Sequence, residues 1–149
     1  MKIITSEYKV RKVKNGITQF GEIKLTIELI ENNTLEIIEN YNGKGFHSQG
    51  YIEILPKKGY DTWKKGISNG IKYAYSKIKS NTRLKVIIEE ASGLSTDTNP
   101  TIIGFAASRA LLSKFENNES EQKLAELEFF VTSSWKYDLD SIPDFESVK

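Results

Sequence analysis

The stretch GLSTDTNPTIIGFAASRALLSKF, residues 93–115, leads from a polar loop that opens on glycine into a helix that is apolar on nearly all sides. Pro100 suits the first helical turn, because its missing N–H would be unpaired there, and Thr98 or Asn99 is suited to cap the helix. Only four residues of the helix expected over 99–115 need solvent: Ser108, Arg109, Ser113 and Lys114. A helix this apolar is predicted to lie buried between layers, where Gly104 allows another helix to approach closely.

A partner for this helix is predicted over residues 60–79. Apolar residues recur there at helical spacing and form one stripe, which consists of Tyr60, Trp63, Ile67, Ile71, Ala74, Tyr75 and Ile78. Gly66 and Gly70 lower the helix propensity and are best explained by close backbone packing. We therefore expect the two helices to pack together on one face of a sheet.

The strands of that sheet are predicted by alternation and by β-branched residues. Residues 22–31 alternate apolar and polar, as a half-buried strand does, and Asn32-Asn33 then predicts a tight turn into a return strand over 34–41. Further strands are expected at 3–13, whose basic face suits a sheet edge, at 51–56 and at 83–90. Residues 119–128 indicate a short helix or extended segment, and 128–137 a last strand. This order predicts an α+β fold with a mainly antiparallel sheet.

The composition of the chain bounds its class. Its 149 residues predict a single domain over 1–149, with a core of about 1–116 and a C-terminal extension of about 117–149. The absence of cysteine excludes disulfides and thiolate metal sites. Neither an apolar signal segment nor a membrane-spanning stretch is found, so a cytoplasmic protein is expected, and the abundance of Lys, Ile and Asn suggests a bacterial one.

Charge is unevenly distributed along the chain. Residues 57–85 hold nine Lys or Arg against one Asp, whereas residues 116–149 hold nine acidic residues against three lysines. Such asymmetry indicates either an anionic partner or two segments that neutralise each other in the fold.

Few residues suggest chemistry. His47 is the only histidine in the chain and lies in a glycine-rich loop without a nucleophile nearby in sequence. Glu89 and Glu90 are adjacent on a strand, so their side chains are expected to point to opposite faces. Asp97 is expected to satisfy the free N–H groups at the start of the following helix, which favours capping over phosphate binding. We therefore predict no catalytic residue, no metal site and no cofactor, and a protein that is not an enzyme.

A row of lysines could contact an anionic partner. Lys65, Lys72 and Lys79 are spaced by seven residues on one helical stripe, with Lys64 beside them. Such a row could follow a phosphate backbone, although a solvated helix face gives the same pattern.

Residues 42–115 resemble domain IV of translocation GTPases of the elongation factor G type. The resemblance is carried by NGKGFHSQGYIEI before a strand, by WKKGISNGI in the first helix, and by LKVIIEE, ASGLSTDTNP and IGFAASRALL in the strand, loop and helix that follow. It implies the fold of the second domain of ribosomal protein S5, with a left-handed βαβ crossover. It also implies that the two polar loops, with Lys44, His47, Ser95 and Thr96, lie against RNA. The nucleotide-binding motif G-x-x-x-x-G-K-[ST] is absent, so the sequence is not that of a whole elongation factor.

Two functions remain open from the sequence. One is a non-enzymatic binding protein that contacts structured RNA or the ribosome. The other is a protein-interaction module, such as an adaptor or a toxin-neutralising partner, that uses its acidic C-terminal part. Neither function involves a membrane or a small-molecule cofactor.

Overall fold

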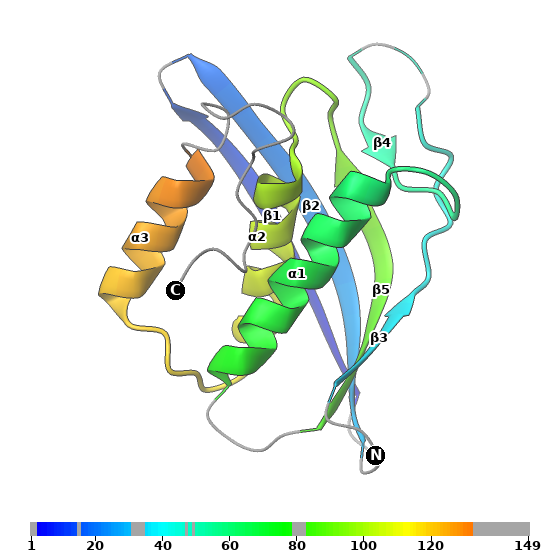
Figure 1. Ribbon diagram of the computed structural model, residues 1–149. Helices are drawn as coiled ribbons and strands as arrows, with labels where there is room; N and C mark the ends of the chain where they lie inside the picture. The colour runs from blue at the N-terminus through cyan, green and yellow to red at the C-terminus, as the bar shows by residue number, and fades with distance from the viewer. Residues whose placement is uncertain are drawn as a thin grey trace.

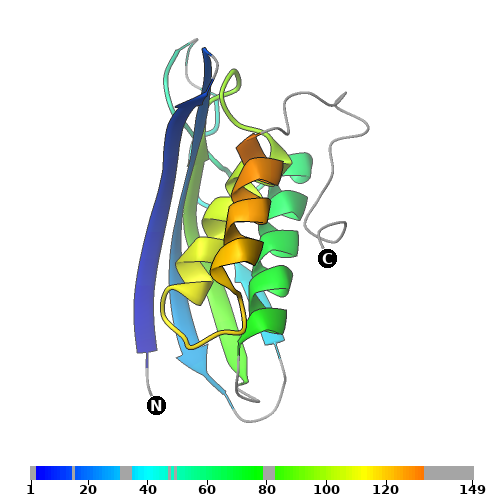
Figure 2. The same ribbon diagram turned by 90° about the vertical axis from the view of Figure 1, so that its left-hand side faces the viewer.

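The computed structural model describes residues 3–14, 16–30, 35–46, 48, 50–78 and 83–132. Its elements are β1 (Ile3–Lys14), β2 (Ile17–Leu29), β3 (Leu35–Glu39), β4 (Glu53–Ile54), α1 (Asp61–Lys77), β5 (Leu84–Gly93), α2 (Pro100–Leu112) and α3 (Glu121–Thr132). The three helices lie on one side of the sheet, as the two views show (Figures 1 and 2). The predicted α+β fold, with both main helices on one face, is confirmed.

The sheet is mainly antiparallel. Its strand order is β1-β2-β5-β3, and β4 pairs with the far end of β5. Strand β3 runs parallel to β5, while the β1–β2, β2–β5 and β4–β5 pairs are antiparallel. Strand β1 lies at the sheet edge, as its basic residues indicated.

The predicted hairpin between residues 22–31 and 34–41 is wrong. The residues of β3 pair with β5, from Leu35 opposite Leu84 to Glu39 opposite Ile88, and not with β2. Leu84, Val86 and Ile88 are fully buried, and a strand with so apolar a face is most stable in the middle of a sheet. Strand β5 therefore separates two strands that are neighbours in sequence, and the turn expected at Asn32-Asn33 lies outside the described residues.

The connection from β3 to β5 has an uncommon hand. Both strands run upwards in Figure 1. Helix α1, which follows β3 and precedes β5 in the sequence, lies in front of the sheet. The chain passes from β3 on the right, across the front through α1, to β5 on the left. This is a left-handed crossover, whereas parallel strands are connected right-handedly in about 98% of cases. The left hand is the one that the resemblance to domain IV implies.

Glycine allows α1 and α2 to pack with their backbones in contact. A Cβ atom at Gly66 would overlap the carbonyl group of Pro100, and one at Gly70 would overlap the carbonyl group of Gly104. On the other side of α2, a Cβ atom at Gly21 of β2 would lie 3.3 Å from the Cα of Ile103. Helix α2 is therefore held closely between α1 and the sheet, and its residues Ile102, Ile103, Ala106, Ala107, Ala110 and Leu111 are fully buried.

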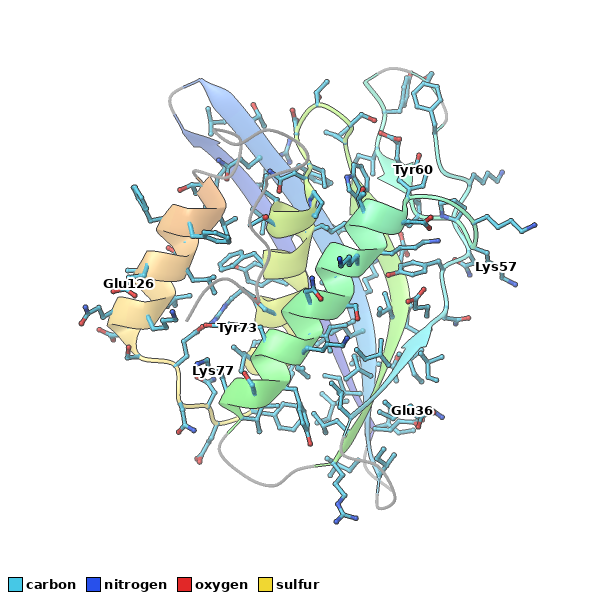
Figure 3. The ribbon with its side chains drawn as sticks, in the orientation of Figure 1. Glu36, Lys57, Tyr60, Tyr73, Lys77 and Glu126 are labelled. Carbon is cyan, nitrogen blue, oxygen red and sulfur yellow. The ribbon has the colours of Figure 1, made fainter. Side chains whose placement is uncertain are left out.

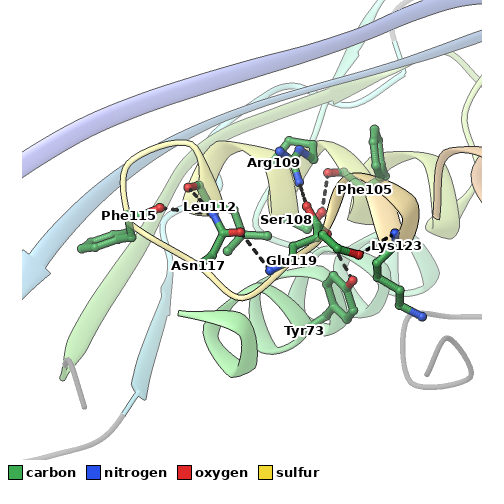
Figure 4. Close-up of polar contacts among 10 residues, drawn as sticks. Tyr73, Phe105, Ser108, Arg109, Leu112, Phe115, Asn117, Glu119 and Lys123 are labelled. Atoms are coloured by element: carbon green, nitrogen blue, oxygen red, sulfur yellow. Dashed lines mark hydrogen bonds and ion pairs between the residues drawn. The ribbon is translucent and has the colours of Figure 1, made fainter. Parts of the chain in front are cut away.

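The segment after α2 is fixed by a small polar cluster (Figure 4). The Arg109 guanidinium forms an ion pair with the buried carboxylate of Glu119, which also accepts a 3.2 Å hydrogen bond from the Tyr73 hydroxyl of α1. Burial, with the neighbouring Glu119 charge, raises the pKa of Tyr73 to about 12, so its hydroxyl remains a donor at neutral pH. The cluster joins both main helices to the start of the C-terminal part.

Helix α3 then returns to the core. Its residues Leu127 and Val131 are buried, and Gln19 of β2 donates a 3.0 Å hydrogen bond to the carbonyl oxygen of Thr132. Residues 128–132 are helical, so the strand expected over 128–137 is wrong in this part, and the remainder lies outside the described residues. The core therefore includes residues beyond 116.

Ser108 of α2, which was expected to need solvent, is buried, and its hydroxyl donates to the carbonyl oxygen of Phe105.

The close contact between α1 and α2 predicts whether a substitution at Gly70 raises or lowers the free energy of unfolding. Replacing Gly70 with Ala should lower the free energy of unfolding by about 3 kcal/mol, because the new methyl group would collide with the backbone at Gly104. Helix propensity alone would raise it by up to about 1 kcal/mol, so urea unfolding separates the two effects by sign. The exposed Lys72→Ala substitution in the same helix serves as the control and should change stability by less than about 0.5 kcal/mol.

Candidate binding site at the distal loops

Two loops lie together at one end of the molecule, here called the distal end. They are the connection 40–52 between β3 and β4, and the connection 94–99 between β5 and α2 (Figure 1). The first loop is fastened to β4, because Gly43 N–H donates to the carbonyl oxygen of Leu55 and Gly45 N–H to that of Ile54, at 3.0 and 2.8 Å. The resemblance implied that these loops belong to one surface, and the described residues place them at the same end.

A buried carboxylate connects the two loops to α1. Glu53 of β4 is 4% exposed and accepts hydrogen bonds from the Ser95 N–H at 3.0 Å, from the Ser95 hydroxyl, and from the Tyr60 hydroxyl at 2.6 Å. Figure 3 shows Tyr60 at the distal end of α1, with Tyr73 and Lys77 towards its other end. Burial alone would raise the pKa of Glu53, but the hydrogen bonds from Ser95 and Tyr60 outweigh it and hold the pKa below its ordinary value. Glu53 is therefore ionised at neutral pH and holds the distal end together.

The start of α2 is capped from within the chain. The Asn99 side chain accepts a 2.8 Å hydrogen bond from Ile102 N–H, and Pro100 follows it in the first turn. Thr98 is bound elsewhere, since its hydroxyl donates to the carbonyl oxygen of Phe20 at 2.6 Å and accepts from Leu94 N–H at 2.8 Å. The capping prediction is confirmed with Asn99 as the cap. The Asp97 carboxylate accepts instead from the Thr96 hydroxyl, so the capping role expected of Asp97 is wrong.

A cleft of about 750 Å³ lies in the first loop. It is lined by Asn42, Gly43, Lys44, Gly45, Phe46, Gly50, Tyr51, Ile52, Ile54 and Glu90. Four of its large apolar residues are unusually open to solvent, with exposed fractions of 64% for Phe46, 62% for Tyr51, 51% for Ile52 and 37% for Ile54. An apolar cluster of this kind, with a few polar groups, is typical of a binding site. This cleft was not predicted from the sequence, although two aromatic residues beside glycines in an otherwise polar loop were a signal for it.

The cleft opens on the face of the sheet away from the helices. Glu53 points to the helices, so the next residue of the strand, Ile54, points to the opposite face. Lys24 of β2 points away from the helices, because its neighbours Ile23 and Leu25 are buried. The Glu90 carboxylate lies 3.6 Å from the ammonium group of Lys24, so Glu90 points to the same open face.

Glu89 lies on this open face as well, which corrects the expectation for the two glutamates. A β-bulge in β5 places Lys24 opposite Glu90 but Leu25 opposite Ile88, so Glu89 is the additional residue. The Glu89 carboxylate accepts hydrogen bonds from Asn40 at 3.0 Å and from Thr26 at 2.7 Å, which lower its pKa. Both oxygens of Glu89 are thereby occupied, whereas Glu90 has only its contact with Lys24 among the interactions described.

The loop residues named from the sequence fall into three groups. Lys44 is exposed and lines the cleft. Ser95 and Thr96 are exposed in the second loop, but the Ser95 hydroxyl is engaged by Glu53. His47 lies outside the described residues.

The predicted lysine row is shorter than expected. Lys65 and Lys72 are exposed on one side of α1, but Lys64 is only 9% exposed. Its ammonium group donates to the carbonyl oxygen of Lys57 at 3.0 Å and lies 4.8 Å from the centre of the Tyr41 ring. Lys64 and Lys65 lie about 100° apart around the helix, and this rotation turns Lys64 inwards. Lys79 lies outside the described residues.

Within the described residues no group of three or more His, Asp or Glu side chains is arranged to hold a metal ion. No helix in the same part of the chain is long and apolar enough to cross a membrane.

Comparison with known proteins supports the fold alone. No protein-family model matches the chain, and no curated protein matches its sequence. Solved structures do match, among them a crystal structure of a protein from Thermus thermophilus, with a TM-score of 0.55 and 20% sequence identity. The match covers 77% of this chain and 16% of that chain, so the neighbour is several times longer and contains this fold as one part.

The Glu53 contacts predict a pH-dependent stability. Replacing Glu53 with Gln should lower the free energy of unfolding by about 2 kcal/mol at pH 7, because charged hydrogen bonds are replaced by neutral ones. Since the folded-state pKa is lowered, the contribution of Glu53 is complete above its unfolded pKa, about 4.5, and is lost as the pH falls through the folded value. Urea unfolding from pH 7 to pH 3 should therefore show the difference between the two proteins shrinking below about pH 4.5. A difference that stays constant over this range would contradict the assignment.

Proposed function

We propose that the protein is a non-enzymatic binding domain that contacts structured RNA, or the ribosome, with its distal end. The observation that carries the proposal is the exposure of Phe46 and Tyr51 beside Lys44 in one glycine-rich loop. Basic side chains that bind phosphates and aromatic rings that stack on bases are the combination that recognises unpaired nucleotides in RNA.

Further lysines extend this basic character along one side of the molecule. Lys57 and Lys58 are exposed in the segment that joins β4 to α1, and Lys65 and Lys72 continue along α1. Figure 3 shows Lys57 beside the distal end of α1. A phosphate backbone that crosses the distal end could follow these lysines past the β4 edge and along α1.

The resemblance to domain IV supports the same surface. In that family the loops corresponding to 42–50 and 94–97 lie at the RNA-contacting end. Here Ser95 of the second loop is hydrogen-bonded to Glu53 of β4, the strand to which the first loop is fastened.

A protein-interaction module is the second candidate. It is favoured by Ile52 and Ile54, which add aliphatic area to the cleft where a nucleic-acid groove is usually more basic. In this case the cleft is the surface that binds the partner protein, and a role for the acidic C-terminal part stays a prediction from the sequence.

Salt dependence distinguishes these functions. A variant with four Lys→Gln substitutions, at Lys44, Lys57, Lys65 and Lys72, should bind RNA or ribosomes more weakly than the wild type. If each lysine neutralises one phosphate, the slope of log K against log salt should become shallower by about 3. Binding is measured from about 50 to 200 mM salt.

The matched control carries the same loss of charge elsewhere. It has four Lys→Gln substitutions outside the proposed surface, at Lys9, Lys85, Lys114 and Lys123, and should retain the wild-type slope. Equal slopes for the two variants, or no binding at low salt, would refute RNA contact through this surface.

A further inference from the structure

We infer that the cleft of the first distal loop captures a single unpaired nucleobase, with guanine preferred. The inference rests on the proposed function and specifies its ligand. The cleft volume of about 750 Å³ falls within the roughly 300–1,000 Å³ of small-molecule sites, so a nucleotide can enter.

The lining matches the parts of a nucleotide. The rings of Phe46 and Tyr51 offer exposed aromatic faces on which a base can stack, and Ile52 and Ile54 add apolar surface. The ammonium group of Lys44 is suited to the phosphate that such a base carries. No single unmodified amino-acid side chain presents a flat aromatic face together with a phosphate group.

Glu90 supplies the group that selects the base. Its side chain is 32% exposed, and its contact with Lys24, at 3.6 Å, leaves oxygen lone pairs for another donor. An ionised carboxylate accepts hydrogen bonds only, and guanine offers it an imino and an amino N–H on the same edge. Uracil offers one N–H donor there, and cytosine and adenine only an amino group, so guanine gains the most.

A cationic ligand fits the same lining less well. Aromatic rings with a carboxylate can bind a lysine or arginine side chain through cation–π and ionic contacts. Here, however, Lys44 lines the same cleft and would repel a cation, and Lys24 already neutralises Glu90. The combination of one cation, one acceptor and aromatic faces favours a base with its phosphate.

The cleft is pre-shaped by its attachment to β4. A Cβ atom at Gly43 would overlap the carbonyl group of Ile54, so glycine lets the loop lie directly against the strand. Gly45 has a φ of 74° and Gly50 a φ of 87°, which are backbone conformations that glycine adopts without strain. The residues held in this way lose less conformational freedom when a ligand binds.

The test uses short labelled RNAs and fluorescence anisotropy. The probes are a single-stranded decamer with one guanine among uridines, the same strand with inosine, which lacks the amino group, and a hairpin in which that guanine is paired. We expect the wild type to bind the guanine strand about tenfold more tightly than either of the others.

Four variants assign the effect to the cleft. Phe46→Ala should weaken binding of the guanine strand about tenfold, whereas Phe129→Ala, at an equally exposed phenylalanine of α3, should leave it unchanged. Glu90→Gln should abolish the preference for guanine over inosine, whereas Glu22→Gln, at a paired carboxylate elsewhere on the open face, should retain it. Circular dichroism verifies that each variant is folded.

The outcomes separate this inference from the proposed function. Base capture would be overturned if the wild type bound paired and unpaired guanine equally, or if Phe46→Ala and Phe129→Ala had equal effects. The proposed function would stand in that case as long as binding still depends on salt and on the four lysines. An absence of binding to any of the RNAs would overturn both.

Discussion

The contact between the backbones of α1 and α2 is the constraint on which the rest of the structure depends. Gly66 and Gly70 meet the carbonyl groups of Pro100 and Gly104, and each glycine lowers helix propensity by roughly 1 kcal/mol relative to alanine. This cost is offset because α2 then lies close to both α1 and the sheet, where its apolar sides are removed from water. The contact begins at Pro100, one residue after the cap of α2, so the loop before α2 is fixed relative to the first turns of α1. Glu53 can therefore accept hydrogen bonds both from Ser95 of that loop and from Tyr60 at the start of α1.

The local features of the fold could be predicted from the sequence, and the pairing of β3 could not. The glycine spacing in α1, the proline at the start of α2 and the alternation in β2 each depend on neighbours within a few residues, and each was predicted. The partner of β3 depends on a strand that follows about 50 residues later in the chain. The turn signal at Asn32-Asn33 suggested a hairpin, but it carries no information about a third strand that competes for the same edge of β2.

The candidate site was predictable only in part for a similar reason. Lys44, Ser95 and Thr96 were named from their loops, but Lys64 was assigned to the surface because a charged residue beside an exposed row is usually solvated. In the fold its ammonium group lies over the Tyr41 ring and donates to the carbonyl oxygen of Lys57, so Lys64 contributes to packing rather than to recognition. The position of Glu90 beside the cleft could not be predicted, because it depends on a loop about 40 residues earlier in the chain.

A bulge in β5 gives the open face two different carboxylates. Glu89 is bound by Thr26 and Asn40 and joins β5 to β2 and to the end of β3, so it stabilises the sheet where β3 leaves it. Glu90, one residue further, is turned to the same face beside the exposed aromatic loop. A regular strand would have directed one of the two carboxylates into the apolar layer beneath the helices, where burial of its charge would be costly. The irregularity in β5 therefore avoids that burial and at the same time supplies the cleft with its acidic group.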